Sequence, residues 1–169
     1  MRAKGLEHVT VSVSDLDRSL LFYHRLLGIP MLGRGEEQGP AMSGPTGTTR
    51  RPFLYADLEL GGGQILELLQ YLTPTKGPVR TNGFAPGNSR IGIRVGDMEV
   101  ALRRLRQAGV RTMFDPVRVA GPASRAGARV VHVSDPDGTS VELVERPRTS
   151  LRPLSHGPTG GNKRLEGRT

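Results

Sequence analysis

Three side chains that could bind a metal ion or move a proton stand in alternating, largely apolar stretches: His8, Glu67 and Glu142. Imidazole nitrogens and carboxylate oxygens are ligands of divalent metals and also common general acids and bases. The chain contains no cysteine, which excludes disulfides, a thiolate metal site and a cysteine nucleophile. Any metal ion must therefore be held by histidine and carboxylate side chains.

An internal repeat relates these positions. The shared offsets are seven residues from His8 to Asp15 and from Arg90 to Asp97, and four from Gly63 to Glu67 and from Gly138 to Glu142. Equal offsets of this kind indicate a duplicated motif. The repeat superimposes His8 on Arg90 and Glu67 on Glu142. Each residue taken singly could be structural, and it is the matched positions that indicate a site.

The first copy predicts a strand, a helix and three further strands. Residues 6–13 alternate, which places the valines toward the core and His8 on the opposite, polar face. Asp15 is the expected cap of a helix that ends at Gly28. The remaining segments are a loop over 33–51, a strand over 53–60, a glycine turn over 61–63 and a strand over 64–69.

The second copy repeats this order, with a strand at 90–95 and a helix capped by Asp97 that ends before Gly109. A short β-rich half cannot bury its own sheet, so the two copies should pack together. We expect an α+β fold, in which two tandem βαβββ modules form a concave mixed sheet with helices outside. The polar strand faces then line the hollow.

The predicted organisation is a first module at 1–71, a linker at 72–89, a second module at 90–145 and a basic, flexible tail at 146–169. The net charge is +8. The tail carries six basic residues against one acidic residue, a net +5, which leaves +3 for the rest. A nucleic-acid role is therefore not expected. No apolar run reaches the ~20 residues that cross a bilayer, and no secretory signal is present, so we expect a cytoplasmic protein.

Residues 6–145 resemble the vicinal oxygen chelate superfamily of glyoxalases, bleomycin resistance proteins and extradiol dioxygenases. The resemblance is carried by Glu7-His8-Val9, by the helix from Asp15 to Gly28, by Leu66-Glu67-Leu68 and by the run from Asp135 to Glu142. It implies a divalent metal held by one residue from each of four strands. His8, Glu67 and Glu142 match three of these positions. Arg90 occupies the fourth, and a guanidinium has no lone pair to donate.

Three alternatives follow for the site. His8, Glu67 and Glu142 could hold Zn, Ni, Mn, Mg or Fe with water, while Arg90 turns toward a substrate carboxylate or phosphate. His132 could complete the ligand set, since a simple hairpin register pairs it with Glu142. In the third alternative no metal binds, Arg90 pairs with Glu67 or Glu142, and His8 works with a carboxylate in acid–base catalysis or simple binding.

The resemblance implies a small-molecule enzyme, and the residues favour a metal-assisted isomerase, epimerase or lyase. Glu67 or Glu142 would be the general base, and a metal or Arg90 would stabilise an enolate. A metal-free binding protein of the antibiotic-resistance type is the alternative. An extradiol-type dioxygenase is disfavoured, because Arg90 replaces its second histidine. We expect a homodimer, a small-molecule substrate that could be anionic, and no membrane partner.

Overall fold

The computed structural model describes residues 2–38, 52–73, 86, 89–121 and 125–147. The predicted linker and tail fall largely outside these residues. Within them, the expected α+β fold of two βαβββ modules is confirmed. No helix in the described part of the chain is long and apolar enough to cross a membrane.

The first module contains six elements, and its strands form one four-stranded sheet in the order β1-β4-β3-β2. The elements are β1 (His8–Ser12), α1 (Leu16–Leu20), the π-helix η1 (Leu21–Leu26), β2 (Met31–Glu37), β3 (Phe53–Gly61) and β4 (Gln64–Tyr71). Strand β1 runs parallel to β4, whereas β2 and β4 pair antiparallel with β3. The sheet is therefore mixed, with β1 at one edge.

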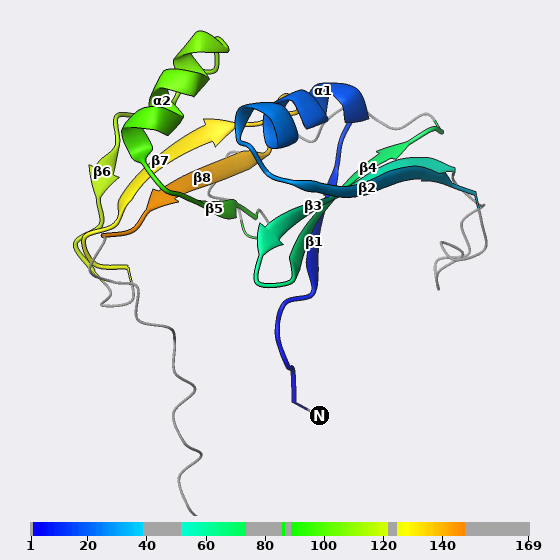
Figure 1. The fold of residues 1–169 in the computed structure, drawn as a ribbon, viewed down its shortest axis with the longest axis horizontal. Coiled ribbons are helices and arrows are strands. Elements are labelled where there is room, and N and C mark those ends of the chain that lie inside the picture. Colours follow the sequence, from blue (N-terminus) through cyan, green and yellow to red (C-terminus); the bar gives the residue numbers. More distant parts are fainter. Residues whose placement is uncertain (1, 39–51, 74–85, 87–88, 122–124, 148–169) are drawn as a thin grey trace, which may run out of the picture.

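The second module repeats this arrangement in the order β5-β8-β7-β6. Its elements are β5 (Ile91–Val95), α2 (Met98–Gln107), β6 (Val117–Arg118), β7 (Arg129–Ser134) and β8 (Ser140–Glu145). Among the described residues no strand pairing joins the two sheets. Figure 1 shows the helices of both modules on the same side of the sheets.

The predicted ends of the helices are confirmed. The side chain of Asp15 accepts a hydrogen bond from the Arg18 amide at 2.9 Å, and that of Asp97 accepts one from the Val100 amide at 3.0 Å. Each satisfies a first-turn amide that has no partner within the helix. Gly28 and Gly109 follow the helices with φ of 74° and 72°, a backbone conformation that favours glycine.

The loop predicted for residues 33–51 is wrong in its first part, because β2 extends to Glu37. Its glycines hid the strand from periodicity analysis. A Cβ on Gly35 would lie 2.9 Å from Cε1 of Tyr55, so the glycine provides the space for that ring. The backbone of Gly35 pairs with that of Tyr55 on β3. Residues 39–51 of the predicted loop lie outside the described residues.

One hydrophobic core serves both modules. It gathers the inner strand faces and the helices, including the fully buried residues Leu58, Leu66, Met98, Val131 and Leu143. Because apolar burial on the helix side stabilises the fold, the opposite faces of both sheets remain for polar side chains. The predicted alternation of the strands is thus confirmed.

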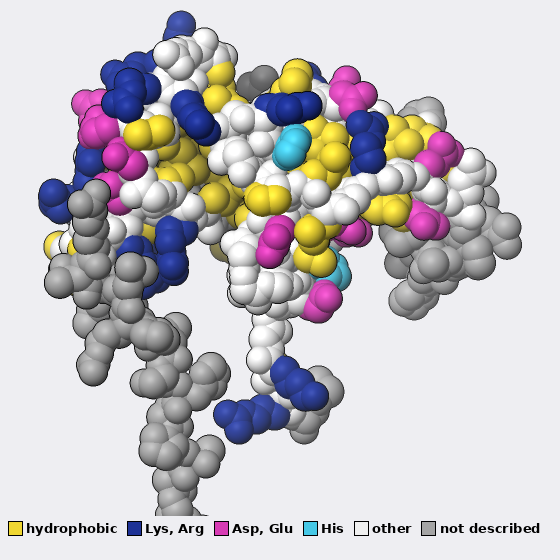
Figure 2. Space-filling model, viewed as in Figure 1, with side chains coloured by type: hydrophobic (Ala, Val, Ile, Leu, Met, Phe, Trp, Pro, Cys, Tyr) yellow, Lys and Arg dark blue, Asp and Glu magenta, His cyan; other side chains and the backbone are white. Residues whose placement is uncertain are grey.

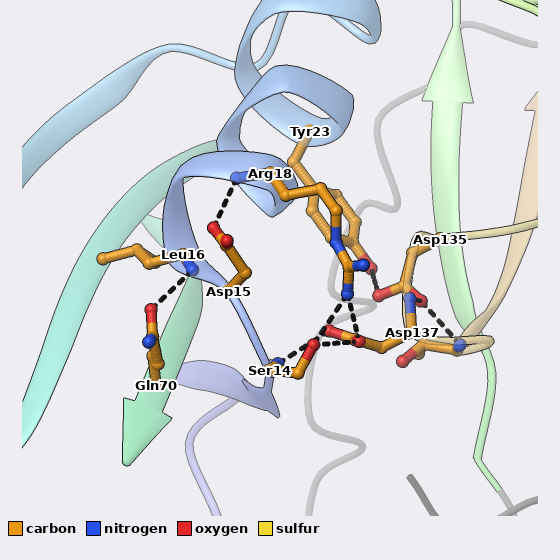
Figure 3. Close-up of polar contacts among 9 residues, drawn as sticks. Ser14, Asp15, Leu16, Arg18, Tyr23, Gln70, Asp135 and Asp137 are labelled. Carbon is orange, nitrogen blue, oxygen red and sulfur yellow. Dashed lines mark hydrogen bonds and ion pairs between the residues drawn. The ribbon is translucent and has the colours of Figure 1, made fainter. Parts of the chain in front are cut away.

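A buried polar contact joins the two modules beside this core (Figure 3). The Tyr23 hydroxyl, on η1, donates a hydrogen bond to Oδ2 of Asp135 at 2.9 Å. Arg18 Nη2 contacts Oδ1 of Asp137 at 2.6 Å, and the Ser14 amide donates to Oδ2 of Asp137 at 2.8 Å. We call these five residues the inter-module contact. It links the first helix to the β7–β8 turn.

Asp135 also holds the backbone of that turn. Oδ1 of Asp135 accepts hydrogen bonds from the amides of Asp137 and Thr139 at 3.0 and 2.7 Å. Burial, followed by the negative charge of Asp135, raises the pKa of Tyr23 above its ordinary value. Tyr23 therefore keeps its proton and remains a hydrogen-bond donor to the carboxylate.

We predict that Tyr23→Phe lowers the free energy of unfolding by about 1–3 kcal/mol, because Asp135 then loses a buried hydrogen bond to a charged group. Urea unfolding followed by circular dichroism measures the change. Tyr71→Phe is the matched control, and its effect should stay within about 0.5 kcal/mol. Equal losses in both variants would contradict a stabilising role for the inter-module contact.

Candidate functional site

The polar face of the first sheet brings together side chains from β1, β3 and β4. Thr10 and Asp57 both pair in register with Glu67, and His8 lies two residues from Thr10 on the same strand face. The Thr10 hydroxyl donates a hydrogen bond to Oε2 of Glu67 at 2.7 Å. We call His8, Thr10, Asp57 and Glu67 the first cluster. It contains two of the predicted site residues.

The surroundings of the first cluster shift the pKa values of His8 and Asp57. A hydrogen bond with Glu7, at 3.0 Å from Nδ1, raises the pKa of His8; partial desolvation opposes this, and the charge of Glu67 adds to the rise. Desolvation, followed by repulsion from Glu67, raises the pKa of Asp57, while His8 lowers it. The pKa values of both His8 and Asp57 are therefore raised above their ordinary values on this face.

The polar face of the second sheet carries the remaining predicted residues. His132 and Glu142 are cross-strand neighbours, as the hairpin register predicted, with Nε2 3.5 Å from Oε1. Both side chains are only 15% exposed. The ring of Phe114 lies against His132, with ring centroids 4.9 Å apart. The register is confirmed, whereas a metal-ligating role for His132 stays a prediction.

Arg125 is a member of this face that sequence analysis missed. Its Nη2 lies 2.9 Å from Oε2 of Glu142. Arg90 instead donates through Nε to the Ser140 hydroxyl at 3.1 Å. Arg125 lies in a segment without strand periodicity, so nothing in the sequence pattern indicated that it reaches Glu142. We call Arg90, Arg125, His132 and Glu142 the second cluster.

The two clusters are not combined into one centre within a chain. Among the described residues, no three histidine, aspartate, glutamate or cysteine side chains lie close enough to hold a metal ion. The first cluster offers His8 and Glu67, and the second offers His132 and Glu142, whose carboxylate is already occupied by Arg125. The donors of a single chain therefore do not fit the four-ligand metal centre that the resemblance implies.

The two polar faces also differ in charge. The first presents Asp57, Glu59 and Glu67, whereas the second presents Arg90 and Arg125 around Glu142. Figure 2 shows acidic side chains below the strands of the first module and lysine or arginine side chains below those of the second, while the N-terminal arm also carries lysine or arginine side chains. Opposite charges on two faces of one molecule favour the approach of one face to the other.

A cleft of about 920 Å³ follows the outer edge of β5. Every residue from Gly92 to Asp97 lines it, together with the β3–β4 turn, the end of η1 and part of α2. Because consecutive strand residues point to opposite faces, lining by all of them places the cleft along the strand edge. The other edge of β5 is paired with β8. Among the described residues the outer edge of β5 therefore has no strand partner.

A family model described as the Glyoxalase/Bleomycin resistance protein/Dioxygenase superfamily matches residues 5–143. A 2-epi-5-epi-valiolone epimerase from an Actinomyces species is 29% identical over 153 residues, covering 86% of this chain and 81% of the relative. A lactoylglutathione lyase from Salmonella typhimurium is 28% identical over 141 residues, covering 83% and 91% of the two chains.

Solved structures agree in fold. A glyoxalase-family protein from Bacillus cereus superimposes with a TM-score of 0.73 at 23% identity, covering 86% of this chain and 96% of the other. A glyoxalase/dioxygenase from Nostoc punctiforme gives a TM-score of 0.60 at 20% identity, covering 85% and 92%. At such identities the likeness establishes the arrangement of elements.

We predict that Asp57→Asn stabilises the protein at neutral pH but not in acid. The pKa of Asp57 is higher in the folded than in the unfolded chain, so the folded state loses stability as pH rises and this carboxyl ionises. An asparagine at this position cannot ionise, so the variant keeps this stability at neutral pH. Its higher free energy of unfolding relative to the native protein should vanish below the pKa of an exposed carboxyl group. Urea midpoints measured from pH 3 to pH 8 test this, and a pH-independent difference would contradict it. Glu36→Gln, on exposed β2, is the control.

Proposed function

Because the chain belongs to the glyoxalase/bleomycin resistance protein/dioxygenase superfamily, we propose that it is a small-molecule enzyme that moves a proton on a carbon next to a carbonyl group. Isomerases, epimerases and lyases of this kind share an enolate-like transition state, which a base and a nearby positive charge stabilise. The names of two relatives, an epimerase and a lactoylglutathione lyase, support this class of reaction.

The observation that carries the proposal is the setting of Glu67. Its carboxylate accepts one hydrogen bond from Thr10, which orients it and leaves lone pairs for a substrate proton. No ion pair is formed by Glu67 among the described residues, unlike Glu142 with Arg125. We therefore assign the general base to Glu67. Glu142 with His132 is the second acid–base pair, able to return a proton.

Arg90 supplies the positive charge in this proposal. One of its five N–H groups is used by Ser140. No hydrogen bond to another described residue uses the remaining donors, which can bind an oxygen that becomes negative during proton removal. A guanidinium stays charged across the physiological pH range. It can therefore stabilise an enolate oxygen without a proton of its own being lost.

We further propose that a second copy of the chain completes the site. Strands β1 and β5 are both edge strands, each paired on one side only among the described residues. Edge strands leave unpaired N–H and C=O groups that can pair with another chain. A two-fold dimer that places β1 of one copy along the β5 edge of the other would bring the first cluster next to the second, twice per dimer. The opposite charges of the two faces support this pairing.

A divalent metal would require the same assembly. His8 and Glu67 from one copy, with His132 and Glu142 from the other, would supply two nitrogen donors and two carboxylates, a set suited to Zn, Ni, Mn or Fe. The ion pair between Glu142 and Arg125 would first have to break. When bound, the ion would act as a Lewis acid toward the developing negative charge. The residues of one chain alone do not provide this set.

A metal-free binding protein is the second candidate. Two observations favour it: Glu142 forms an ion pair with Arg125, and position 90 carries an arginine, which cannot ligate a metal ion. Such a protein would use the same polar faces to hold a ligand without turnover. If the protein exchanged no hydrogen next to a carbonyl group for deuterium, this candidate would be favoured.

We predict that the protein exchanges the hydrogen next to a carbonyl group for deuterium in D2O in at least one compound of a panel of 2-hydroxyaldehydes, 2-hydroxyketones and 2-substituted acids. Glu67→Gln should lower the exchange rate by about 10²–10⁴-fold, the usual contribution of a general base. Proton NMR detects exchange in any compound of the panel, so the natural substrate need not be identified first. Glu36→Gln is the matched control and should keep the native rate. Equal rates for Glu67→Gln and the native protein would contradict the assignment.

We predict that two inactive variants regain activity when they form a mixed dimer. One variant carries His8→Ala with Glu67→Gln, and the other carries Arg90→Ala with Glu142→Gln. A mixed dimer purified through two different tags has one intact composite site of two, so about half of the native activity should return. A site made within one chain would stay inactive in this dimer. A monomer in analytical ultracentrifugation would also contradict the proposal.

We predict that protein purified without chelators contains a divalent metal, and that His8→Ala and Glu142→Ala each lose it. Elemental analysis measures the metal-to-chain ratio. His132→Ala should lower the ratio only if this histidine is a ligand, and Arg111→Ala serves as a control for general effects of substitution. Full proton exchange by metal-free native protein would contradict metal assistance.

A further inference from the structure

Two arginines flank Gly92 on the polar face of β5: Arg90 directly precedes the strand, and Arg94 lies within it. Ile91 and Ile93 are buried in the core, so the alternating residues Arg90, Gly92 and Arg94 face the other way. Arg90 is anchored by its hydrogen bond to Ser140. Arg94 is exposed and forms no ion pair among the described residues.

Gly92 opens a gap between these arginines. It pairs in register with Glu142, and a Cβ placed on it would lie 3.8 Å from Oε2 of that carboxylate. Any side chain at position 92 would therefore begin in contact with the Glu142 carboxylate. Gly92 and Arg94 also line the cleft along β5. The glycine leaves space for a ligand group between the two arginines.

The charge balance at this point favours an anion. Glu142 is the one carboxylate that lies at Gly92 in the described strands, and Arg125 already neutralises it at 2.9 Å. Arg90 and Arg94 then add two positive charges without a matching carboxylate on β5 or β8 at this face. Guanidinium groups bind carboxylates and phosphates through paired, charge-assisted hydrogen bonds.

We propose that Arg90 and Arg94 form a clamp for a carboxylate or phosphate group of the substrate, held over Gly92. This inference rests on the proposed function, because it assigns the substrate class of that site. The substrate is then an anionic small molecule whose reacting carbon lies beside the clamped group. Arg94, which sequence analysis did not single out, becomes a binding residue.

The test is an NMR titration of the full-length protein with inorganic phosphate, with malonate and with uncharged malonamide, at constant ionic strength. The backbone amide signal of Gly92 reports binding. We expect a saturable shift with phosphate or malonate and none with malonamide. The tighter of the two anions assigns the group as phosphate or carboxylate.

Variants separate the clamp from the general positive charge of the chain. Arg90→Gln and Arg94→Gln should each weaken anion binding about tenfold or more, since each removes charge-assisted hydrogen bonds. Arg106→Gln on α2 removes the same charge elsewhere and should bind like the native protein. Arg94→Lys, which keeps the charge, should bind more tightly than Arg94→Gln.

Two results would overturn the clamp: no saturable shift of Gly92 with either anion, or an equal loss of affinity in Arg106→Gln. The titration requires no turnover, so it is independent of the enzyme proposal. Anion binding through Arg90 and Arg94 without proton exchange on any compound would support the clamp and reject the enzyme. Proton exchange without anion binding would reject the clamp alone.

Discussion

The hydrogen bond from the buried Tyr23 hydroxyl to Asp135 ties the two modules together beside their common core. It joins the first helix to a turn whose backbone amides are held by the same carboxylate. Both partners are almost fully buried, so separating them would leave a carboxylate without its donor in an apolar setting, which is costly. The first helix is thereby held against the second module, and one core serves both modules.

The polar sheet faces follow from that arrangement. The apolar faces of both sheets pack into the common core. The opposite faces therefore carry the polar side chains of His8, Glu67, His132 and Glu142. The edges of β1 and β5 are left open in the described part of the chain. A protein with two open edges and two faces of opposite charge has a physical reason to pair with itself. The proposed composite site depends on this geometry.

Arginine occupies one of the four positions that the family resemblance predicts for metal ligands, and the structure shows the contacts around it. Arg90 turns to Ser140, Arg125 neutralises Glu142, and Gly92 keeps the space above the carboxylate free. Fixed guanidinium charge differs from a bound metal ion because it needs no ligand set and is insensitive to chelators. The proposed clamp uses that permanent charge to select an anionic substrate.

The sequence alone determined the duplicated modules, the helix caps at Asp15 and Asp97, the inward valines and the pairing of His132 with Glu142. These features depend on local periodicity, capping chemistry and a short hairpin, so neighbouring residues suffice to define them. Tertiary structure alone decided the ion pair of Arg125 with Glu142, the contact of Tyr23 with Asp135, strand β2 beneath the ring of Tyr55, and the separation of the strands into two sheets. Each of these requires the meeting of segments far apart in the chain, which no local pattern specifies.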